Sequence, residues 1–335
     1  MELRQLGRTG LRVSAVGMGG IPIQRVDFRR AAEVVACAIG QGVNFIDTAR
    51  AYTDSEAKLG EVLGKNRENV IIATKSMART KDDMTRDIGI SLESLRVNYI
   101  DLYQLHNIKD EGALLRVLAP DGALSALREA QKRGQIRFVG ITGHIPAVLV
   151  KAVKTGEFDT VQFPFNPIET TGAEELLPLA KEMGIGIIAM KPFAGGAVKN
   201  KAFALRFILE QGFSTVIPGM DDVSQVTENL AAGHEPKPLT NLERVSLAEE
   251  ASVLGGSFCR RCEYCQPCPQ GIDIPMVFLL DGYWTRYGLQ EWAVDRYRPL
   301  KARASDCVEC GECESKCPYQ LPIREMLKEA ARHLE

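Results

Sequence analysis

Eight of the nine cysteines lie in two short runs near the C-terminus, at spacings that suit metal ligands. The runs are Cys259-x2-Cys262-x2-Cys265-x2-Cys268-Pro269 and Cys307-x2-Cys310-x2-Cys313-x3-Cys317-Pro318. Disulfide frameworks belong to small secreted domains, so clustered cysteines in a chain of 335 residues indicate a metal centre in a reducing compartment. Cysteine quartets that each precede a proline are typical of iron–sulfur ligation, with structural zinc as the alternative.

The two cysteine runs form an internal repeat, because the residues after each run also match in pattern. These continuations are Gln270-Gly271-Ile272-Asp273-Ile274 and Tyr319-Gln320-Leu321-Pro322-Ile323. The ninth cysteine, Cys37, falls within an apolar helical pattern, which predicts a buried thiol without a chemical role.

A second set of residues suits proton transfer. The apolar stretch from Gly42 ends in the carboxylate of Asp47, and the phenol of Tyr52 follows five residues later. A phenol has a pKa near 10 and becomes a useful acid only when a neighbouring ammonium stabilises its anion. Lys75 is the candidate ammonium, Asp47 would keep it charged, and His106 could orient a substrate oxygen.

Short apolar runs that alternate with amphipathic helical patterns would position these residues. Eight strands are predicted, at Val13 to Met18, Phe45 to Thr48, Val70 to Thr74, Ile100 to Leu105, Phe138 to Ile141, Thr160 to Phe163, Gly186 to Met190 and Thr215 to Ile217. Such alternation implies parallel strands in an open doubly wound sheet or a closed barrel, and the number eight favours an α/β (β/α)8 TIM barrel. The segment from Gly17 to Gly20 lacks the glycine spacing of a dinucleotide-binding turn.

Polar residues at the predicted strand ends agree with a barrel enzyme, because such enzymes place their chemistry at the C-terminal ends of the strands. These residues are Asp47, Lys75, His106, Thr142, Gln162, Asn166 and Lys191. Helix signals support the intervening elements: Asp27 can cap a helix that ends before Gly42, and Thr80 or Lys81 can open one that runs to about Arg96.

The composition changes abruptly after Gly255-Gly256, so we predict a domain boundary there. Residues 1–255 would form the barrel, and residues 256–335 would form a small, mainly α domain that contains both cysteine runs. An initial hairpin is expected before the barrel, with its turn at Arg8-Thr9-Gly10.

The first domain resembles the aldo-keto reductases, whose active-site tetrad is Asp, Tyr, Lys and His in this chain order. Asp47, Tyr52, Lys75 and His106 match it, and the resemblance covers about residues 1 to 250. It implies NAD(P)H-dependent hydride transfer to or from a small carbonyl or alcohol substrate, with Tyr52 as the general acid and base.

The same resemblance implies a set of cofactor-binding positions: Thr142, Gln162, Met190, Lys191, Gly219, Gln225, Glu228 and Asn229. Met190 stands where an aromatic residue usually stacks on the nicotinamide. Gly219 and Gln225 occupy places where many members carry the lysine and arginine that grip a 2′-phosphate, so NAD and NADP both stay open.

The cysteine repeat resembles bacterial ferredoxins, in which three cysteines of one run and the fourth of the other bind each [4Fe-4S] cluster. This ferredoxin-like pattern implies two clusters, one on Cys259, Cys262, Cys265 and Cys317 and one on Cys307, Cys310, Cys313 and Cys268. The two halves together resemble aldo-keto reductases that carry a C-terminal ferredoxin-like domain.

Charge and hydropathy exclude several other functions. The net charge of −2 gives no field that would attract nucleic acid, and no apolar run reaches the roughly 18 residues of a membrane span. Without a signal peptide at Met1 to Gly7, we expect a cytoplasmic protein.

The alternative to carbonyl reduction is electron transfer. In this alternative the clusters carry the main function, and the barrel binds a nicotinamide or flavin or docks a redox partner protein.

Overall fold

A computed structural model describes residues 1–234 and 236–335, apart from the side chains of residues 65 and 66. The chain divides into two compact units. The barrel unit comprises Met1–Pro192 and Lys201–Asn241, and the C-terminal unit comprises Phe193–Asn200 and Leu242–Glu335. The predicted boundary near residue 256 falls at the end of helix α10 (Asn241–Gly255), whereas packing groups this helix, from residue 242 on, with the C-terminal unit.

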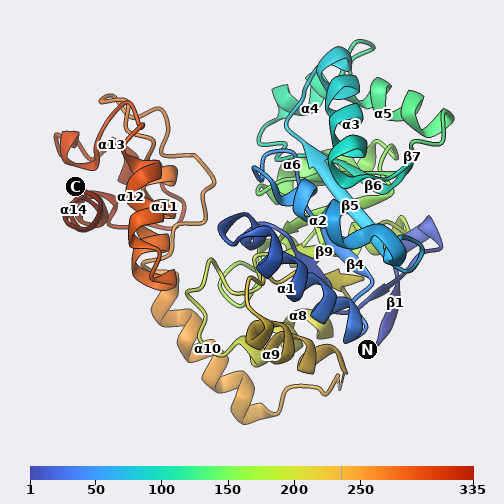
Figure 1. The fold of residues 1–335 in the computed structure, drawn as a ribbon. Coiled ribbons are helices and arrows are strands. Elements are labelled where there is room, and N and C mark those ends of the chain that lie inside the picture. The colour runs from blue at the N-terminus through green and yellow to red at the C-terminus, as the bar shows by residue number, and fades with distance from the viewer. Residues whose placement is uncertain (235) are drawn as a thin grey trace. The chain divides into compact units, whose positions relative to one another are not determined.

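Eight parallel strands in sequence order form the centre of the barrel unit (Figure 1). They are β3 (Met18–Gly19), β4 (Phe45–Asp47), β5 (Ile71–Ser76), β6 (Ile100–Leu105), β7 (Ile136–Thr142), β8 (Thr160–Pro164), β9 (Gly186–Met190) and β10 (Thr215–Val216). Parallel bridges between Val16 and Val216 and between Gly19 and Gly219 link the first and last strands. The predicted eight-stranded TIM barrel is therefore confirmed.

Nine helices of the described residues belong to the barrel unit (Figure 1). One follows each barrel strand, except that two lie between β6 and β7. The nine helices are α1 (Phe28–Gly40), α2 (Ser55–Leu63), α3 (Lys81–Leu95), α4 (Glu111–Leu118), α5 (Ala123–Lys132), α6 (Pro146–Lys154), α7 (Leu176–Glu182), α8 (Lys201–Glu210) and α9 (Val223–His234). The carboxylate of Asp27 accepts the Arg30 amide at 2.7 Å, and Thr80 likewise caps α3. The predicted cap at Asp27 and the predicted helix start at Thr80 or Lys81 are confirmed.

An antiparallel hairpin of β1 (Leu3–Gln5) and β2 (Arg12–Ser14) precedes the barrel. The single strand predicted over residues 13–18 is wrong, because the chain changes partner there: the Ala15 amide donates to Glu2, and the Gly17 amide donates to Val216. The run therefore divides into a hairpin strand and barrel strand β3. Leu6 and Val13 pack with the buried apolar side chains Phe45, Leu102 and Ile188.

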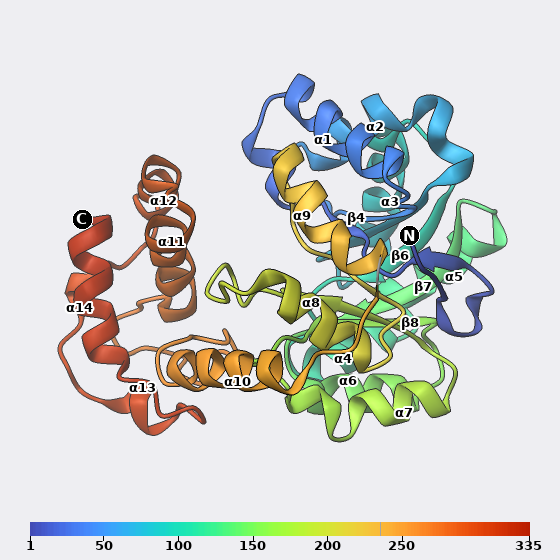
Figure 2. The same ribbon diagram turned by 90° about the horizontal axis from the view of Figure 1, so that it is seen from below.

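The C-terminal unit is mainly helical, as predicted. Besides α10 it contains α11 (Ile274–Tyr287), α12 (Gln290–Tyr297), α13 (Glu312–Ser315) and α14 (Ile323–Leu334), of which α11, α12 and α14 pack side by side (Figure 2). Its core combines apolar side chains of α11 and α14, such as Val277 and Leu327, with Cys265 and Cys313.

Short 3-10 helices connect elements in both units. They span Gly7–Thr9, Pro22–Arg25, Gly64–Asn69, Thr171–Ala173 and Ala304–Asp306. In the described residues, no helix is long and apolar enough to cross a membrane.

Candidate active site and cysteine-lined cavities

Strand alternation decides which side chains enter the barrel. On β5, Thr74 points outward and donates a 2.7 Å hydrogen bond to Glu56 of α2. Its neighbour Lys75 therefore points inward, since successive side chains of a strand face opposite sides. Gln104 is paired with Lys75 in the register of β5 and β6 and enters the same space. Gly140 of β7 leaves room for Gln104, because an added Cβ would lie 2.9 Å from the Gln104 Cγ.

Asp47, Lys75, Gln104 and Gln162 form a polar group inside the barrel, with a buried ion pair between Lys75 and Asp47 at its centre. Lys75 also donates a 2.8 Å hydrogen bond to the Thr48 carbonyl oxygen. The amide of Gln104 donates to Asp47 Oδ2 and to Gln162 Oε1, both at 3.1 Å. Asp47 is thus held from two sides, and every member of the group is at most 2% exposed.

The pKa values of this pair reflect burial and mutual attraction. Burial raises the pKa of Asp47 above its ordinary value, although Lys75, Gln104 and Gln162 all favour the carboxylate. Burial by itself would lower the pKa of Lys75, but Asp47 and Tyr52 outweigh it, so the pKa of Lys75 is raised. Lys75 consequently stays an ammonium at neutral pH.

Tyr52 lies in the loop between β4 and α2, beside this ammonium. The Lys75 Nζ is 5.1 Å from the centroid of the Tyr52 ring, and Tyr52 contributes to raising the pKa of Lys75. The ring of His106 meets the Tyr52 ring edge-on, with centroids 5.9 Å apart. The structure thus brings together Asp47, Tyr52, Lys75 and His106, which come from three strand ends and one loop.

His106 is neutral at physiological pH. Burial lowers its pKa well below 6.5, and the positive charges of Lys75, Arg79 and Lys191 lower it further. Its Nδ1 atom is buried without a hydrogen-bond partner among the described residues. A neutral imidazole in this place can donate or accept one hydrogen bond without adding charge beside Lys75.

Four further predicted positions lie at the same ends of the strands. Thr142 Oγ1 accepts the Asn107 amide at 2.8 Å, and the Gln162 amide lies 3.7 Å from the Met190 sulfur. Lys191, directly after β9, has its ammonium hydrogen-bonded to His144 Nε2.

The remaining predicted positions follow β10 and lie on α9. Gly219 approaches Pro22 so closely that an added Cβ would be 2.6 Å from the Pro22 Cγ. Gln225 is occupied by two 3.0 Å hydrogen bonds with Asp221, and Glu228 forms a 3.0 Å ion pair with Lys201. Asn229 is 2% exposed, and its Oδ1 has no partner among the described residues.

The sequence reasoning missed Gln104, Asn107 and Arg79 as members of this site. Gln104 could have been found, because it lies two residues before His106 and strand alternation places both on one face. Arg79 lies in the loop before α3 and donates to the carbonyl oxygens of His106 and Asn107 at 2.8 and 2.9 Å. No local pattern indicates this contact across two loops.

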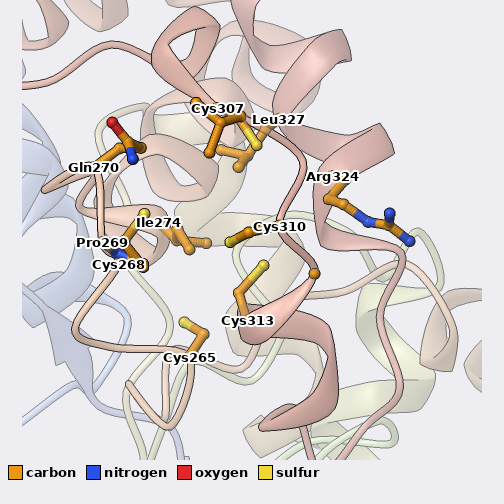
Figure 3. A pocket seen from close by; sticks show the side chains of 12 residues that line it. Cys265, Cys268, Pro269, Gln270, Ile274, Cys307, Cys310, Cys313, Arg324 and Leu327 are labelled. Carbon is orange, nitrogen blue, oxygen red and sulfur yellow. The ribbon is translucent and has the colours of Figure 1, made fainter.

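The cysteines of the C-terminal unit surround two cavities. The first encloses about 350 Å³ of empty space, including solvent at its opening, and Figure 3 shows its cysteines arranged around one space. Its cysteines are Cys265, Cys268, Cys307, Cys310 and Cys313. Ile274, Val308 and Leu327 add apolar walls. Cys268 thus joins the cysteines of the other run.

The second cavity encloses about 320 Å³ and is lined by Cys259, Cys262, Cys265 and Cys317. Burial raises the pKa of the Cys265 thiol to about 12, so a metal is needed to hold it as a thiolate at neutral pH. In the described residues, no group of three or more metal-ligating side chains is arranged around a single ion.

Cys37, by contrast, is half-buried on α1, where it accepts a 3.3 Å hydrogen bond from Gln41. The predicted buried thiol is thus only partly covered on this face of α1.

Residues 15–203 match the model of the aldo/keto reductase family. The L-galactose dehydrogenase of Arabidopsis thaliana is 31% identical over 307 residues, which cover 76% of this chain and 94% of that protein. The chain belongs to the aldo/keto reductase family. This aldo/keto reductase also matches a 4Fe-4S dicluster domain at residues 258–322. The protein is therefore an oxidoreductase with a C-terminal iron–sulfur domain.

Similar proteins and structures agree on the barrel. The aldo-keto reductase AKR11C1 of Bacillus halodurans, in its holo form, has a TM-score of 0.64 and 26% identity over 75% of this chain and 96% of its own. The oxidoreductase YrpG of Bacillus subtilis is 31% identical over 60% of this chain and 69% of its own. The candidate site described above thus lies in a barrel of the aldo/keto reductase type.

Proposed function

We propose that this aldo/keto reductase interconverts a small carbonyl compound and its alcohol with a nicotinamide cofactor, using Tyr52 as general acid and base. The observation that carries this proposal is the position of Lys75, which is ion-paired with Asp47 and lies 5.1 Å from the centroid of the Tyr52 ring. An ammonium held in this way stabilises the phenolate that remains after Tyr52 gives up its proton.

Each residue of the tetrad has its own role in the proposed proton transfer. A bound nicotinamide would supply the hydride for the carbonyl carbon. Tyr52 donates its hydroxyl proton to the carbonyl oxygen, and in the reverse direction its phenolate takes the proton back. His106, which is neutral, orients that oxygen by a hydrogen bond, and Asp47 keeps Lys75 charged throughout. Burial of the ion pair excludes water from these contacts.

The cofactor would be held by the residues around the strand ends. Thr142 and Gln162 suit the carboxamide, Met190 the nicotinamide ring, and Lys191 a phosphate. Farther along the chain, Gly219, Gln225, Glu228 and Asn229 suit the adenosine half. The buried, unpartnered Oδ1 of Asn229 supports this assignment, because an adenine amino group could satisfy it.

NAD and NADP differ by one phosphate, and two positions bear on the choice. A lysine at position 219 would collide with Pro22, and Gln225 is already bonded to Asp221. Neither position therefore offers a cation to a 2′-phosphate. We infer that both cofactors are candidates, and that NADP would bind without the lysine and arginine that usually contact its 2′-phosphate at these two positions.

We further propose that the C-terminal unit holds two [4Fe-4S] clusters with crossed ligands. Cys259, Cys262, Cys265 and Cys317 would bind one cluster, and Cys307, Cys310, Cys313 and Cys268 the other. The two cavities support this grouping. The second is lined by three cysteines of the first run and Cys317, and the first by three cysteines of the second run and Cys268, with Cys265 shared by both cavities. Such clusters need a reducing compartment, which supports a cytoplasmic location.

The function can be tested with the full chain purified under argon. Oxidation of NADH or NADPH in the presence of a panel of small aldehydes and ketones should be faster than without them. Stopped-flow mixing with NADPH in the absence of a carbonyl distinguishes electron transfer. Bleaching of the cluster absorbance near 400 nm without carbonyl turnover would replace our proposal with the electron-transfer function.

A further inference from the structure

The segment that joins strand β9 to helix α8, Phe193–Asn200, packs with the C-terminal unit although both of its chain neighbours belong to the barrel unit. We call it the β9–α8 segment. Ala194 and Val198 within it are at most 2% exposed. The segment is therefore a packed part of the structure, and its packing depends on residues that come more than 40 positions later in the chain.

Glu250 of helix α10 holds the end of the β9–α8 segment. Its Oε1 accepts a 2.5 Å hydrogen bond from the Lys199 amide, and its Oε2 accepts a 2.9 Å hydrogen bond from the Asn200 side chain. Hydrogen bonds to a carboxylate are stronger than those between neutral groups. The next residue back on the same helix, Glu249, is exposed and provides a matched control.

Arg286 of helix α11 holds the middle of the segment. Its Nε donates a 2.9 Å hydrogen bond to the Gly195 carbonyl oxygen. Gly282, one turn earlier on α11, leaves the space that the guanidinium occupies, because an added Cβ would overlap it. An added Cβ at Gly196 would lie only 3.0 Å from the Tyr287 ring. The segment thus lies directly against α11.

The backbone from the end of β9 into the segment has an unusual conformation. The φ angles of Lys191, Ala194, Gly195 and Gly196 are 56°, 46°, 62° and 79°, all in the left-handed region. Residues other than glycine seldom adopt it, and such conformations persist only where the surroundings enforce them. The contacts with α10 and α11 are therefore needed to keep the segment in this course.

The aromatic ring of Phe258 connects these contacts with a proposed cluster ligand. The Arg286 guanidinium lies 5.9 Å from the centroid of this ring, and an added Cβ at Gly195 would lie 3.9 Å from it. Phe258 is 7% exposed and directly precedes Cys259, which lines the second cavity. Because metal binding is coupled to the folding of the residues that provide the ligands, a cluster on Cys259 would fix Phe258 in place.

We propose that Glu250 and Arg286 are positioning residues for the nicotinamide cofactor, and that cluster assembly at Cys259 strengthens cofactor binding through the β9–α8 segment. This inference rests on the proposed function, in which Met190 and Lys191 contact the cofactor. These two residues lie within three positions of the segment, so a held segment restricts the chain at the end of β9. When the arrangement that binds a ligand is only partly populated, the affinity falls by that fraction.

Cofactor affinity in the full chain, purified under argon with its clusters, tests the two positioning residues. Fluorescence titration with NADH or NADPH measures the dissociation constant. We expect Glu250→Leu and Arg286→Met each to weaken binding on the order of tenfold. Glu250→Gln and Arg286→Lys keep one acceptor and one donor, so they should recover much of the affinity. Glu249→Leu should bind as the native protein does.

Hydrogen exchange followed by mass spectrometry reports on the segment itself. Glu250→Leu and Arg286→Met should speed exchange in the β9–α8 segment and leave helix α5 unchanged, with the native iron content in each variant. Faster exchange together with a native dissociation constant would show that the two residues hold the segment without positioning the cofactor. That result would overturn the proposal.

Removal of iron tests the coupling to the clusters. Treatment of the native full chain with a chelator should weaken cofactor binding on the order of tenfold and speed exchange in the segment, and reconstitution with iron and sulfide should restore both. In Arg286→Met the same treatment should change the dissociation constant much less. Coupling is reciprocal, so bound cofactor should raise the iron content at a fixed chelator concentration. Equal affinities with and without clusters would refute the coupling.

Carbonyl turnover separates this inference from the proposed function. If carbonyls are reduced but cofactor affinity responds neither to the two variants nor to iron removal, the inference is wrong and the proposed reaction stands. If cofactor affinity responds as expected but the panel of carbonyls is not reduced, the proposed reaction is wrong and the positioning role stands.

Discussion

The side-chain amide of Gln104 donates a 3.1 Å hydrogen bond to Asp47 across the intervening strand β5. The same amide donates to Gln162, so it links the buried ion pair to a residue proposed to hold the carboxamide. Gln104 therefore connects the proton-transfer residues with the proposed cofactor site inside the barrel.

Replacement of Gln104 by methionine keeps the side-chain length but removes this donor. We expect the free energy of unfolding to fall by about 1–3 kcal/mol, because a buried carboxylate loses a hydrogen bond. Urea unfolding at pH 7.5 measures the change. Gln131→Met, on helix α5, is the control and should lose clearly less. Equal losses in the two variants would show that Asp47 does not depend on Gln104.

Replacement of Tyr52 by phenylalanine removes the proposed proton donor and leaves the ring. We expect kcat for carbonyl reduction to fall by about 10² to 10⁴, the usual contribution of general acid catalysis. The cofactor dissociation constant should change little, and Tyr99→Phe serves as a matched variant of a tyrosine outside the site. A Tyr52→Phe protein with full activity would refute the assignment.

The Lys75–Asp47 pair is buried, so removing one partner leaves the other charge buried without an ion-pair partner. We expect Lys75→Met to lower the free energy of unfolding by about 3–5 kcal/mol. The double variant Asp47→Leu with Lys75→Met should recover much of this loss, since neither charge remains. Lys81→Met breaks a half-exposed pair with Glu129 and provides the control, with a much smaller effect. Equal losses in the single and double variants would contradict the pairing.

The depressed pKa of His106 makes stability depend on pH. Below pH 6.5 the unfolded chain binds a proton at this histidine, whereas the folded protein does not until the pH reaches its much lower folded-state pKa. The free energy of unfolding should therefore fall with decreasing pH in this window, by up to about 1.4 kcal/mol per pH unit from this group. Urea unfolding at pH 7.5 and 5.5 should show a smaller fall for His106→Gln than for the native protein, and an identical fall would contradict the shift.

Cys268 tests the crossed ligands of the proposed clusters. With two [4Fe-4S] clusters we expect about eight irons per chain, and about four after Cys268→Ala removes one ligand. Cys37→Ala, outside both cavities, should keep the native count. Iron and acid-labile sulfide analysis under argon measures both variants. A native count near four would contradict two clusters.

Several features could be predicted from the sequence because they depend on local pattern. Alternating apolar runs predicted the barrel strands, and Asp27 and Thr80 predicted two helix starts. Resemblance then grouped Asp47, Tyr52, Lys75 and His106, which the structure places in contact. Gln104 was within reach of the same reasoning, since strand alternation puts it beside His106.

Contacts between loops were decided only by the tertiary structure. The order and register of the strands set the distances between strand ends, and they bring Arg79 to Asn107 and Lys191 to His144. In the C-terminal unit, packing of α11 against α14 places Cys268 beside the second cysteine run. Periodicity encodes which face of an element is buried, whereas contacts between distant loops depend on how all the elements pack.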